Sequence, residues 1–135
     1  MRWDQINFDD GEIRIEAAQS KTGRSRTFKM DETTTTWLES CKGREFFPDN
    51  FKNDWPEMLR KAGFGSAKDG LRPWVKDILR HTSISHFFRK SGSYGLSAER
   101  FGNSEAIIKR HYQGRVSSEE TKRFYAIMPK GKDGR

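Results

Sequence analysis

The sequence predicts an α+β fold that is mainly α-helical, with a small three-stranded antiparallel sheet at its N-terminal side. Apolar and polar residues alternate over residues 1–30, as in half-buried strands. Over residues 31–129 the apolar residues recur every three or four positions, as in helices. A length of 135 residues fits one domain around a single core. We therefore expect one domain over 1–129 and a disordered tail over 130–135.

The predicted sheet begins with Ile6 and Phe8, which alternate with polar neighbours. The turn Asp9-Asp10-Gly11 then leads to a second alternating run over 13–17. A further turn, "SKTGRS", precedes a third run over 27–30. This pattern predicts three short antiparallel strands with a basic second turn.

Helical patterns fill the rest of the chain. Asp31 can cap a helix that stops near Gly43, and either Asn50 or Asp54 can begin the next one, which contains Pro56. The strongest helical spacing predicts a helix over about 74–90. Three shorter helices are predicted over 94–101, 104–113 and 118–127. Asn103 is the expected N-cap of the second of these, and Ser117 with Glu120 has the spacing of a capping box for the third.

Charge and composition narrow the class of protein. The 26 Lys and Arg residues exceed the 19 Asp and Glu residues, giving a net charge of +7, which favours a polyanionic partner. No apolar run approaches the ~18 residues of a membrane span, and the N-terminus lacks the apolar stretch of a signal peptide. One cysteine, Cys41, excludes an internal disulfide. We expect a cytoplasmic protein with no membrane partner.

The segment "DILRHTSISHFF" contains the first candidate site. Asp77 and Arg80 lie three residues apart, so they share a helix face. Taken alone, this spacing favours an ion pair over a phosphate-binding arginine, and it favours a structural hydrogen bond for His81. His86 and His111 have no metal-ligand spacing with other residues. We therefore expect no metal and no cofactor.

Three further segments change the interpretation of Arg80. These are "SKTGRSRTFKM", which carries Lys21, "ERFGNSEAIIKRHY", in which Tyr112 follows Asn103 by nine residues, and the opening "RWDQI". Together with "DILRHTSISHFF" they resemble, in order and spacing, the catalytic domain of the tyrosine recombinases, the phage integrase family. The resemblance covers the chain from Trp3 to about Pro129.

The resemblance implies a fold of the tyrosine recombinase type and a reaction in which Tyr112 attacks a DNA phosphodiester and forms a 3′-phosphotyrosyl link. Arg80 would bind the non-bridging phosphate oxygens, and Lys21 would protonate the departing 5′-oxygen. Asp77 and Asn103 occupy two further catalytic positions. Double-stranded DNA is the implied partner, with self-association of the full-length protein on DNA. The expected DNA-binding residues are Arg24, Arg26, His81, Lys109 and Arg110.

The chain departs from the family pattern at three places. The family's first arginine precedes the "RWDQI" position, so we expect it to be missing and residues 1–135 alone to be inactive. Asp77 stands where many members carry a histidine or lysine, and it cannot act as a cationic phosphate ligand. Asn103 replaces the usual His or Trp, which keeps a hydrogen-bond donor but removes acid–base capacity.

Alternatives therefore remain at this stage. One is a DNA-binding remnant of an integrase that has lost catalysis, and another is a basic domain that binds protein partners. Tyr94 and Tyr125 are rival nucleophiles. Tyr112 is favoured over both because Lys109 and Arg110 precede it and place positive charge nearby.

Overall fold

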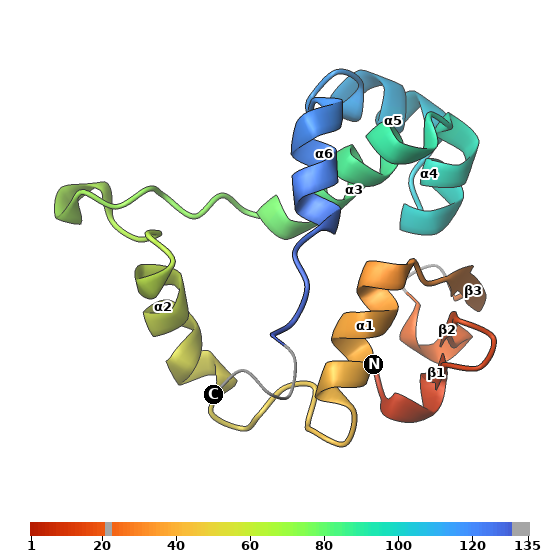
Figure 1. The fold of residues 1–135 in the computed structure, drawn as a ribbon, viewed down its shortest axis with the longest axis horizontal. Coiled ribbons are helices and arrows are strands. Elements are labelled where there is room, and N and C mark those ends of the chain that lie inside the picture. Colours follow the sequence, from red (N-terminus) through yellow and green to blue (C-terminus); the bar gives the residue numbers. More distant parts are fainter. Residues whose placement is uncertain (21–22, 131–135) are drawn as a thin grey trace. The chain divides into compact units, whose positions relative to one another are not determined.

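The computed structural model describes residues 1–20 and 23–130. The chain forms two compact units: residues 1–46 together with the described residues from Val116 onward, and Phe47–Arg115. Helices predominate, and the strands form one three-stranded antiparallel sheet (Figure 1). The predicted α+β, mainly helical class is confirmed.

The sheet lies in the first unit and has the order β1-β2-β3, with β1 at Ile6–Asn7, β2 at Glu12–Ile15 and β3 at Arg26–Lys29. Ile13 pairs with Ile6 on one side and with Phe28 on the other. Ile6 and Ile13 are both buried, so the alternation in the sequence reflects one covered face. The three predicted strands are confirmed, but Phe8 lies in the turn after β1 and Ala17 begins a 3-10 helix after β2. Lys21, in the second turn, lies outside the described residues.

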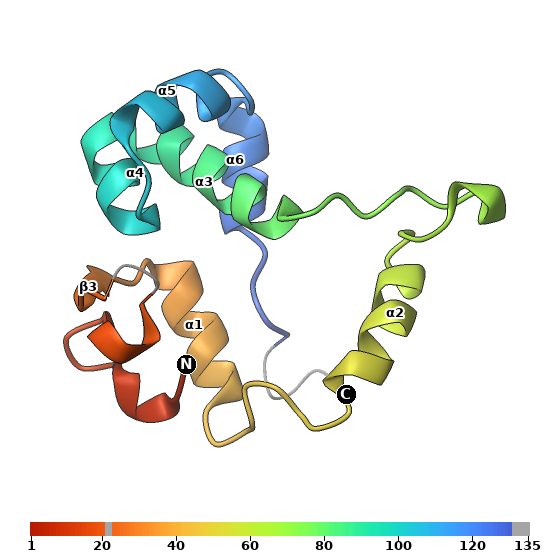
Figure 2. The same cartoon turned by 180° about the vertical axis from the view of Figure 1, so that it is seen from behind.

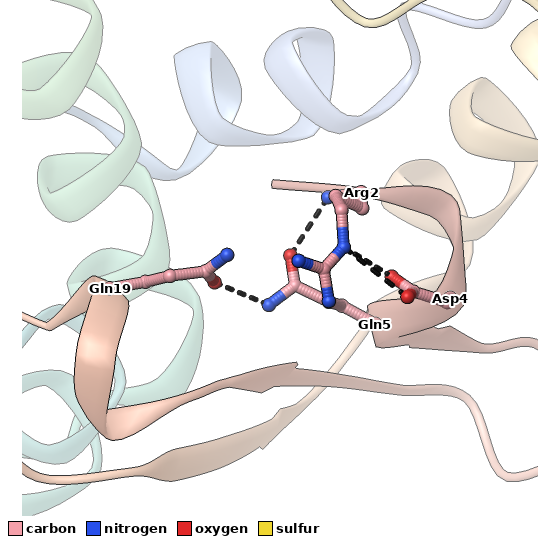
Figure 3. A network of polar contacts seen from close by, with 4 residues as sticks. All are labelled: Arg2, Asp4, Gln5 and Gln19. Carbon is pink, nitrogen blue, oxygen red and sulfur yellow. Dashed lines mark hydrogen bonds and ion pairs between the residues drawn. The ribbon is translucent and has the colours of Figure 1, made fainter.

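A polar network surrounds the start of the chain, before β1 (Figure 3). The Arg2 guanidinium pairs with Asp4 at 3.1 Å, which raises the pKa of Arg2. The Arg2 backbone N–H donates to Gln5 Oε1 at 2.8 Å, and the Gln5 amide donates to Gln19. Gln5 is buried, so these bonds satisfy an amide that would be costly to cover unpaired.

The first unit also contains two helices, α1 at Glu32–Cys41 and α6 at Ser118–Tyr125. Asp31 caps α1 by accepting from the Thr34 N–H, as predicted. The predicted capping box of α6 is confirmed. Thr33 Oγ1 donates to the Tyr125 carbonyl at 2.9 Å, and Trp37 Nε1 donates to the Ile127 carbonyl at 2.9 Å. Side chains one turn apart on α1 thus bind the chain at the end of α6.

The second unit contains α2 at Phe51–Lys61, α3 at Ile78–Ser91, α4 at Tyr94–Phe101 and α5 at Glu105–Tyr112. Asn50, one of the two predicted starts, is the N-cap of α2. The helices α3, α4 and α5 pack against one another, and both views show them side by side (Figures 1 and 2). Their shared core is formed by Ile84, Ile108 and Tyr112.

Two predictions about helix ends are wrong. The helix predicted over 74–90 begins at Ile78, because Asp77 has φ 57° and this left-handed conformation interrupts the helix. Trp74 instead packs against Trp55 and Phe64.

The second error concerns the N-cap of α5. Ser104 caps that helix, its hydroxyl accepting from the Ile107 N–H. Asn103 lies one residue earlier, and its side chain accepts from Arg80. Asn103 and Ser104 are both residue types that cap helices well, so the sequence could not distinguish them. The Asn103 side chain binds Arg80 instead, and Ser104 is left to cap α5.

No helix among the described residues has the length and apolar character needed to cross a membrane.

Candidate functional site

Arg80 extends from the first turn of α3 toward the connection between α4 and α5. Its Nη2 donates to the Phe101 carbonyl at 2.6 Å and to Asn103 Oδ1 at 3.0 Å. Phe101 is the last residue of α4, and a carbonyl at a helix C-terminus has no intrahelical partner. The guanidinium supplies that partner. Nη2 of Arg80 therefore fixes the turn that leads into α5.

The rest of the Arg80 guanidinium remains available. An arginine carries five N–H donors in a planar fork, and Nη2 makes both of the bonds just described. Within residues 1–20 and 23–130, Nε and Nη1 make no hydrogen bond, and the Arg80 side chain forms no ion pair with Asp77. The simple ion-pair interpretation of the 77–80 spacing is therefore wrong. Asp77 lies at the N-cap position of α3 and makes no side-chain capping bond.

Tyr112, the last residue of α5, is covered by the helices around it. The residue is only 5% exposed, and it packs in the core with Ile84 and Ile108, which are both fully buried. Its hydroxyl lies 2.9 Å from Nδ1 of His81, and the two ring centroids are 5.7 Å apart. A phenol hydroxyl in such a place needs a hydrogen-bond partner. His81 is that partner.

Two consecutive residues on α3 therefore bind the two motif residues that lie beyond α4. Arg80 binds Asn103 across 23 positions of sequence, and His81 binds Tyr112 across 31. The sequence placed these residues in separate segments, and the packing of α3, α4 and α5 brings them together. An arginine with free donors can bind a phosphodiester, and a hydrogen-bonded phenol on a neighbouring helix can attack one.

The expected DNA-binding residues are distributed over both units. Lys109 and Arg110 are exposed in the last turn of α5, on the approach to Tyr112. Arg24 and Arg26 are exposed near the start of β3 in the first unit. Lys21 lies outside the described residues, so its predicted role stays a prediction.

The rival tyrosines have other surroundings. The Tyr94 ring stacks on Phe88 with centroids 4.9 Å apart. The Tyr125 ring packs edge to face with Phe124, with ring centroids 5.2 Å apart. The backbone carbonyl of Tyr125 accepts a hydrogen bond from the Thr33 hydroxyl. Across the described residues, no group of three His, Cys, Asp or Glu side chains gathers as metal ligands would.

Sequence reasoning missed two features of the site. It did not identify the Phe101 carbonyl as a partner of Arg80, because a backbone acceptor leaves no signal in residue types. It expected a structural hydrogen bond for His81 but could not name Tyr112 as the partner. The nearest signal was the position of His81 directly after Arg80, on a helix with mixed polar and apolar faces.

Comparison with known proteins gives one distant relative. No family model matches the chain, and no solved structure matches it. Prophage integrase IntA of Escherichia coli (strain K12) is 30% identical over 105 residues, which is 74% of this chain and 24% of the integrase. The chain thus spans about a quarter of the length of this relative. The similarity supports a relationship to integrases that includes most of the described chain.

Proposed function

We propose that this chain is part of the catalytic domain of a site-specific tyrosine recombinase, which cleaves and rejoins DNA through a 3′-phosphotyrosyl intermediate. The observation that carries the proposal is the pair of bonds from consecutive α3 residues, Arg80 to Asn103 and His81 to Tyr112. These four residues belong to two of the segments that resemble the integrase family. The similarity to a prophage integrase supports an integrase-type function.

The proposed reaction conserves the phosphodiester bond energy. The Tyr112 oxygen forms a bond to phosphorus, and the bond from phosphorus to the 5′-oxygen breaks. That oxygen leaves with its electron pair and receives a proton, for which Lys21 is the proposed donor. A 5′-hydroxyl of another strand can then attack the phosphotyrosine and reverse the sequence without ATP. Rejoining is therefore chemically equivalent to cleavage.

Arg80 would stabilise the charge that develops on phosphate in this reaction. Its Nε and Nη1 donors are free of protein partners within the described residues, whereas its Nη2 is held on the α4–α5 connection. With Nη2 held, the Nε–H and Nη1–H donors point in fixed directions without reorganising, and preorganised donors of this kind stabilise a transition state most. Asn103 would act on the reaction through Arg80, by fixing its orientation.

A DNA-binding remnant without catalysis is the second candidate function. The observation that favours it is the burial of Tyr112, whose side chain is covered and paired instead of open to a phosphate. In this case the basic residues would still bind DNA, while Tyr112 would serve as a core residue. The two candidates differ in whether Tyr112 becomes covalently attached to DNA.

Trapping that attachment tests the proposal. We would incubate the protein with a pool of duplexes whose central sequence is randomised, each nicked a few nucleotides beyond the centre. Cleavage near the nick releases a short strand that diffuses away, so the phosphotyrosyl adduct accumulates. Because the family's first arginine would precede Trp3, the test uses a chain extended to carry it. We expect residues 1–135 alone to react on the order of a hundred- to thousandfold more slowly.

The expected adduct maps to Tyr112 by peptide mass spectrometry and is absent from Tyr112→Phe. Tyr94→Phe, which alters a rival tyrosine stacked on Phe88, is the matched control and should retain the adduct. An adduct at Tyr94 or Tyr125 would show that the wrong nucleophile has been assigned. If the extended chain binds the pool yet forms no adduct, the non-catalytic function replaces the proposed one.

A further inference from the structure

The partner of the Tyr112 hydroxyl has chemical consequences beyond packing. Within the described residues, His81 Nδ1 is the one hydrogen-bond partner of this hydroxyl, at 2.9 Å. A general base must lie within about 2.6–3.2 Å of the group whose proton it takes. The imidazole meets that condition before any DNA is bound. A histidine is also the side chain that most readily exchanges a proton near neutral pH.

The two sides of this hydrogen bond differ in exposure. Tyr112 is buried in the core of α3 and α5, whereas His81 is exposed on α3. A proton accepted at Nδ1 can therefore pass to solvent through the exposed ring. His81 also shares the first turn of α3 with Arg80, so the proposed phosphate-binding group and the proton acceptor are held by one rigid element.

We propose that His81 is the general base for Tyr112: its Nδ1 accepts the phenol proton as the tyrosine oxygen attacks phosphorus. This inference rests on the proposed function and assigns a residue for the proton that the attacking group must lose. In the reaction the O–H bond of Tyr112 breaks, the oxygen–phosphorus bond forms, and the leaving oxygen departs with its electron pair. The imidazole becomes imidazolium and then returns its proton to water.

His111 is the nearest rival for this role. It directly precedes Tyr112 on α5, and the centroids of the two rings are 6.5 Å apart in an edge-to-face arrangement. That contact joins the faces and edges of rings and does not include the hydroxyl. His111 is exposed, as His81 is, so it provides a matched control that differs in the one feature under test, the bond to the phenol oxygen.

The first experiment needs no DNA target. Bis(4-nitrophenyl) phosphate is a small phosphodiester whose leaving group, nitrophenolate, departs without being protonated, so the reaction does not depend on Lys21. Attack by Tyr112 releases one nitrophenolate, which is followed by its absorbance, and leaves a phosphodiester on the tyrosine. Peptide mass spectrometry then identifies the labelled residue. The experiment uses the extended chain and its variants, and the extended wild-type chain should be labelled at Tyr112 faster than at Tyr94 or Tyr125.

The variant His81→Asn separates two roles of His81, which are accepting the hydrogen bond of the Tyr112 hydroxyl and accepting its proton. The asparagine amide places an oxygen close to the position of Nδ1, so it can accept the hydrogen bond but cannot accept a proton. General base catalysis contributes about 10²–10⁴-fold, so labelling of Tyr112 in His81→Asn should slow at least about a hundredfold. His111→Asn should react at nearly the wild-type rate. Thermal denaturation of each variant checks that the fold is retained.

The second measurement tests the direction of the hydrogen bond itself. In a neutral histidine one ring nitrogen is a donor and the other an acceptor, and a base at Nδ1 requires the proton on Nε2. Nitrogen NMR of histidine-labelled protein should show Nδ1 of His81 unprotonated. The same spectrum of Tyr112→Phe should show a shift of that resonance.

Three outcomes would overturn the inference. These are equal labelling of the extended wild-type chain and its His81→Asn variant, a proton on Nδ1 in the neutral ring, and an extended wild-type chain that is not labelled at Tyr112. None of these outcomes by itself decides the proposed function, which is tested separately by formation of the DNA adduct. If the extended wild-type chain forms that adduct while any of these results holds, the assignment of the base fails alone. If no adduct forms, the recombinase function fails.

Discussion

At the scale of single residues, Arg80 combines an observed structural contact with a proposed role in binding phosphate. Its Nη2 satisfies the last carbonyl of α4 and the Asn103 side chain, while its other donors have no partner within the described residues. A lysine has the same charge but a single ammonium on a flexible stem. It cannot bind the α4–α5 connection through one nitrogen and present donors on other nitrogens to a phosphate. The two roles of Arg80 can therefore be separated by substitution.

We predict that Arg80→Lys, made in the extended chain, lowers the rate of DNA adduct formation far more than it lowers DNA affinity. The retained charge still attracts phosphate, whereas the loss of the Nε and Nη1 donors removes stabilisation of the transition state. One lost donor of this kind typically costs on the order of a hundred- to thousandfold in rate. Gel quantification of the adduct and fluorescence titration of a duplex give the two values.

Arg123→Lys is the matched control, because Arg123 forms a surface pair with Glu119 at 3.3 Å and has no assigned role in the reaction. It should leave the adduct rate unchanged. A loss of binding as large as the loss of rate in Arg80→Lys would contradict the prediction. A loss of stability without any effect on DNA chemistry would show that Arg80 serves the α4–α5 connection alone.

Asp77 gives a second prediction at this scale. Its φ of 57° lies in the left-handed region, where a side chain costs about 1–2 kcal/mol. Asp77→Gly removes the Cβ responsible and breaks no side-chain capping bond. We expect the free energy of unfolding to rise by up to roughly 1 kcal/mol, after the extra chain entropy of glycine is subtracted.

Urea denaturation of Asp77→Gly and the wild-type chain gives this difference directly. Gly92, at φ 65° after α3, supplies the opposite case, since Gly92→Ala should lower stability by a similar amount. If Asp77→Gly is destabilising, the carboxylate contributes to the start of α3 in a way that its contacts do not reveal.

At the scale of elements, the connection between α4 and α5 divides its tasks among three consecutive residues. Gly102 adopts φ 67° and ends α4, Asn103 receives Arg80, and Ser104 caps α5. Each task needs a different chemical group: freedom from a Cβ, an amide oxygen, and a small hydroxyl beside the first helical turn. Each of the three residues in this connection therefore has its own structural role.

We predict that Ser104→Ala and Asn103→Ala affect different properties. Ser104→Ala removes an N-cap and should lower the free energy of unfolding by about 1 kcal/mol, with little effect on Arg80. Asn103→Ala leaves the cap of α5 intact but releases one of the two bonds of Arg80. Its main effect should be a slower adduct reaction in the extended chain.

Denaturation midpoints and adduct rates for both variants distinguish the two effects. Ser117→Ala, which removes the N-cap of α6 in the other unit, is the control for the general cost of losing a cap. Should Asn103→Ala lower stability as much as Ser104→Ala while leaving the reaction intact, its amide would be part of the helix cap after all.

At the scale of the whole molecule, the net charge of +7 leads us to predict DNA binding that weakens as salt rises. Neutralising a phosphate releases condensed counterions, so log K falls linearly with log salt, with a slope of about −0.9 for each phosphate contacted. If about four phosphates are neutralised, the slope is about −3.6. Fluorescence titration of a labelled duplex at several salt concentrations measures this slope for the 135-residue chain.

A double variant tests whether two particular cations contribute to the binding of phosphates. Arg24→Gln with Arg26→Gln removes two exposed cations near β3 and should make the slope less steep by about 1.8. Arg2→Gln removes a cation that is already paired with Asp4 and should change the slope much less. Binding that is insensitive to salt, or absent at low salt, would exclude DNA as the partner.

The features that the sequence alone determined depend on residues close together in the chain. The alternation that marks the three strands, the cap of α1 at Asp31 and the capping box at Ser117 can each be read from residues within about four positions of one another. The order of the recombinase-like segments, with Tyr112 nine residues after Asn103, could also be read directly. So could the basic charge that favours DNA.

Tertiary structure decided which of these residues meet. Asn103 and Ser104 are both good N-caps, and local chemistry could not show that packing of α3 against α4 would turn Asn103 toward Arg80, 23 residues away. His81 could have faced solvent or another side chain, and its bond to Tyr112 exists because α3 and α5 share a core. Long-range contacts depend on how helices pack, and the identity of a residue does not carry that information.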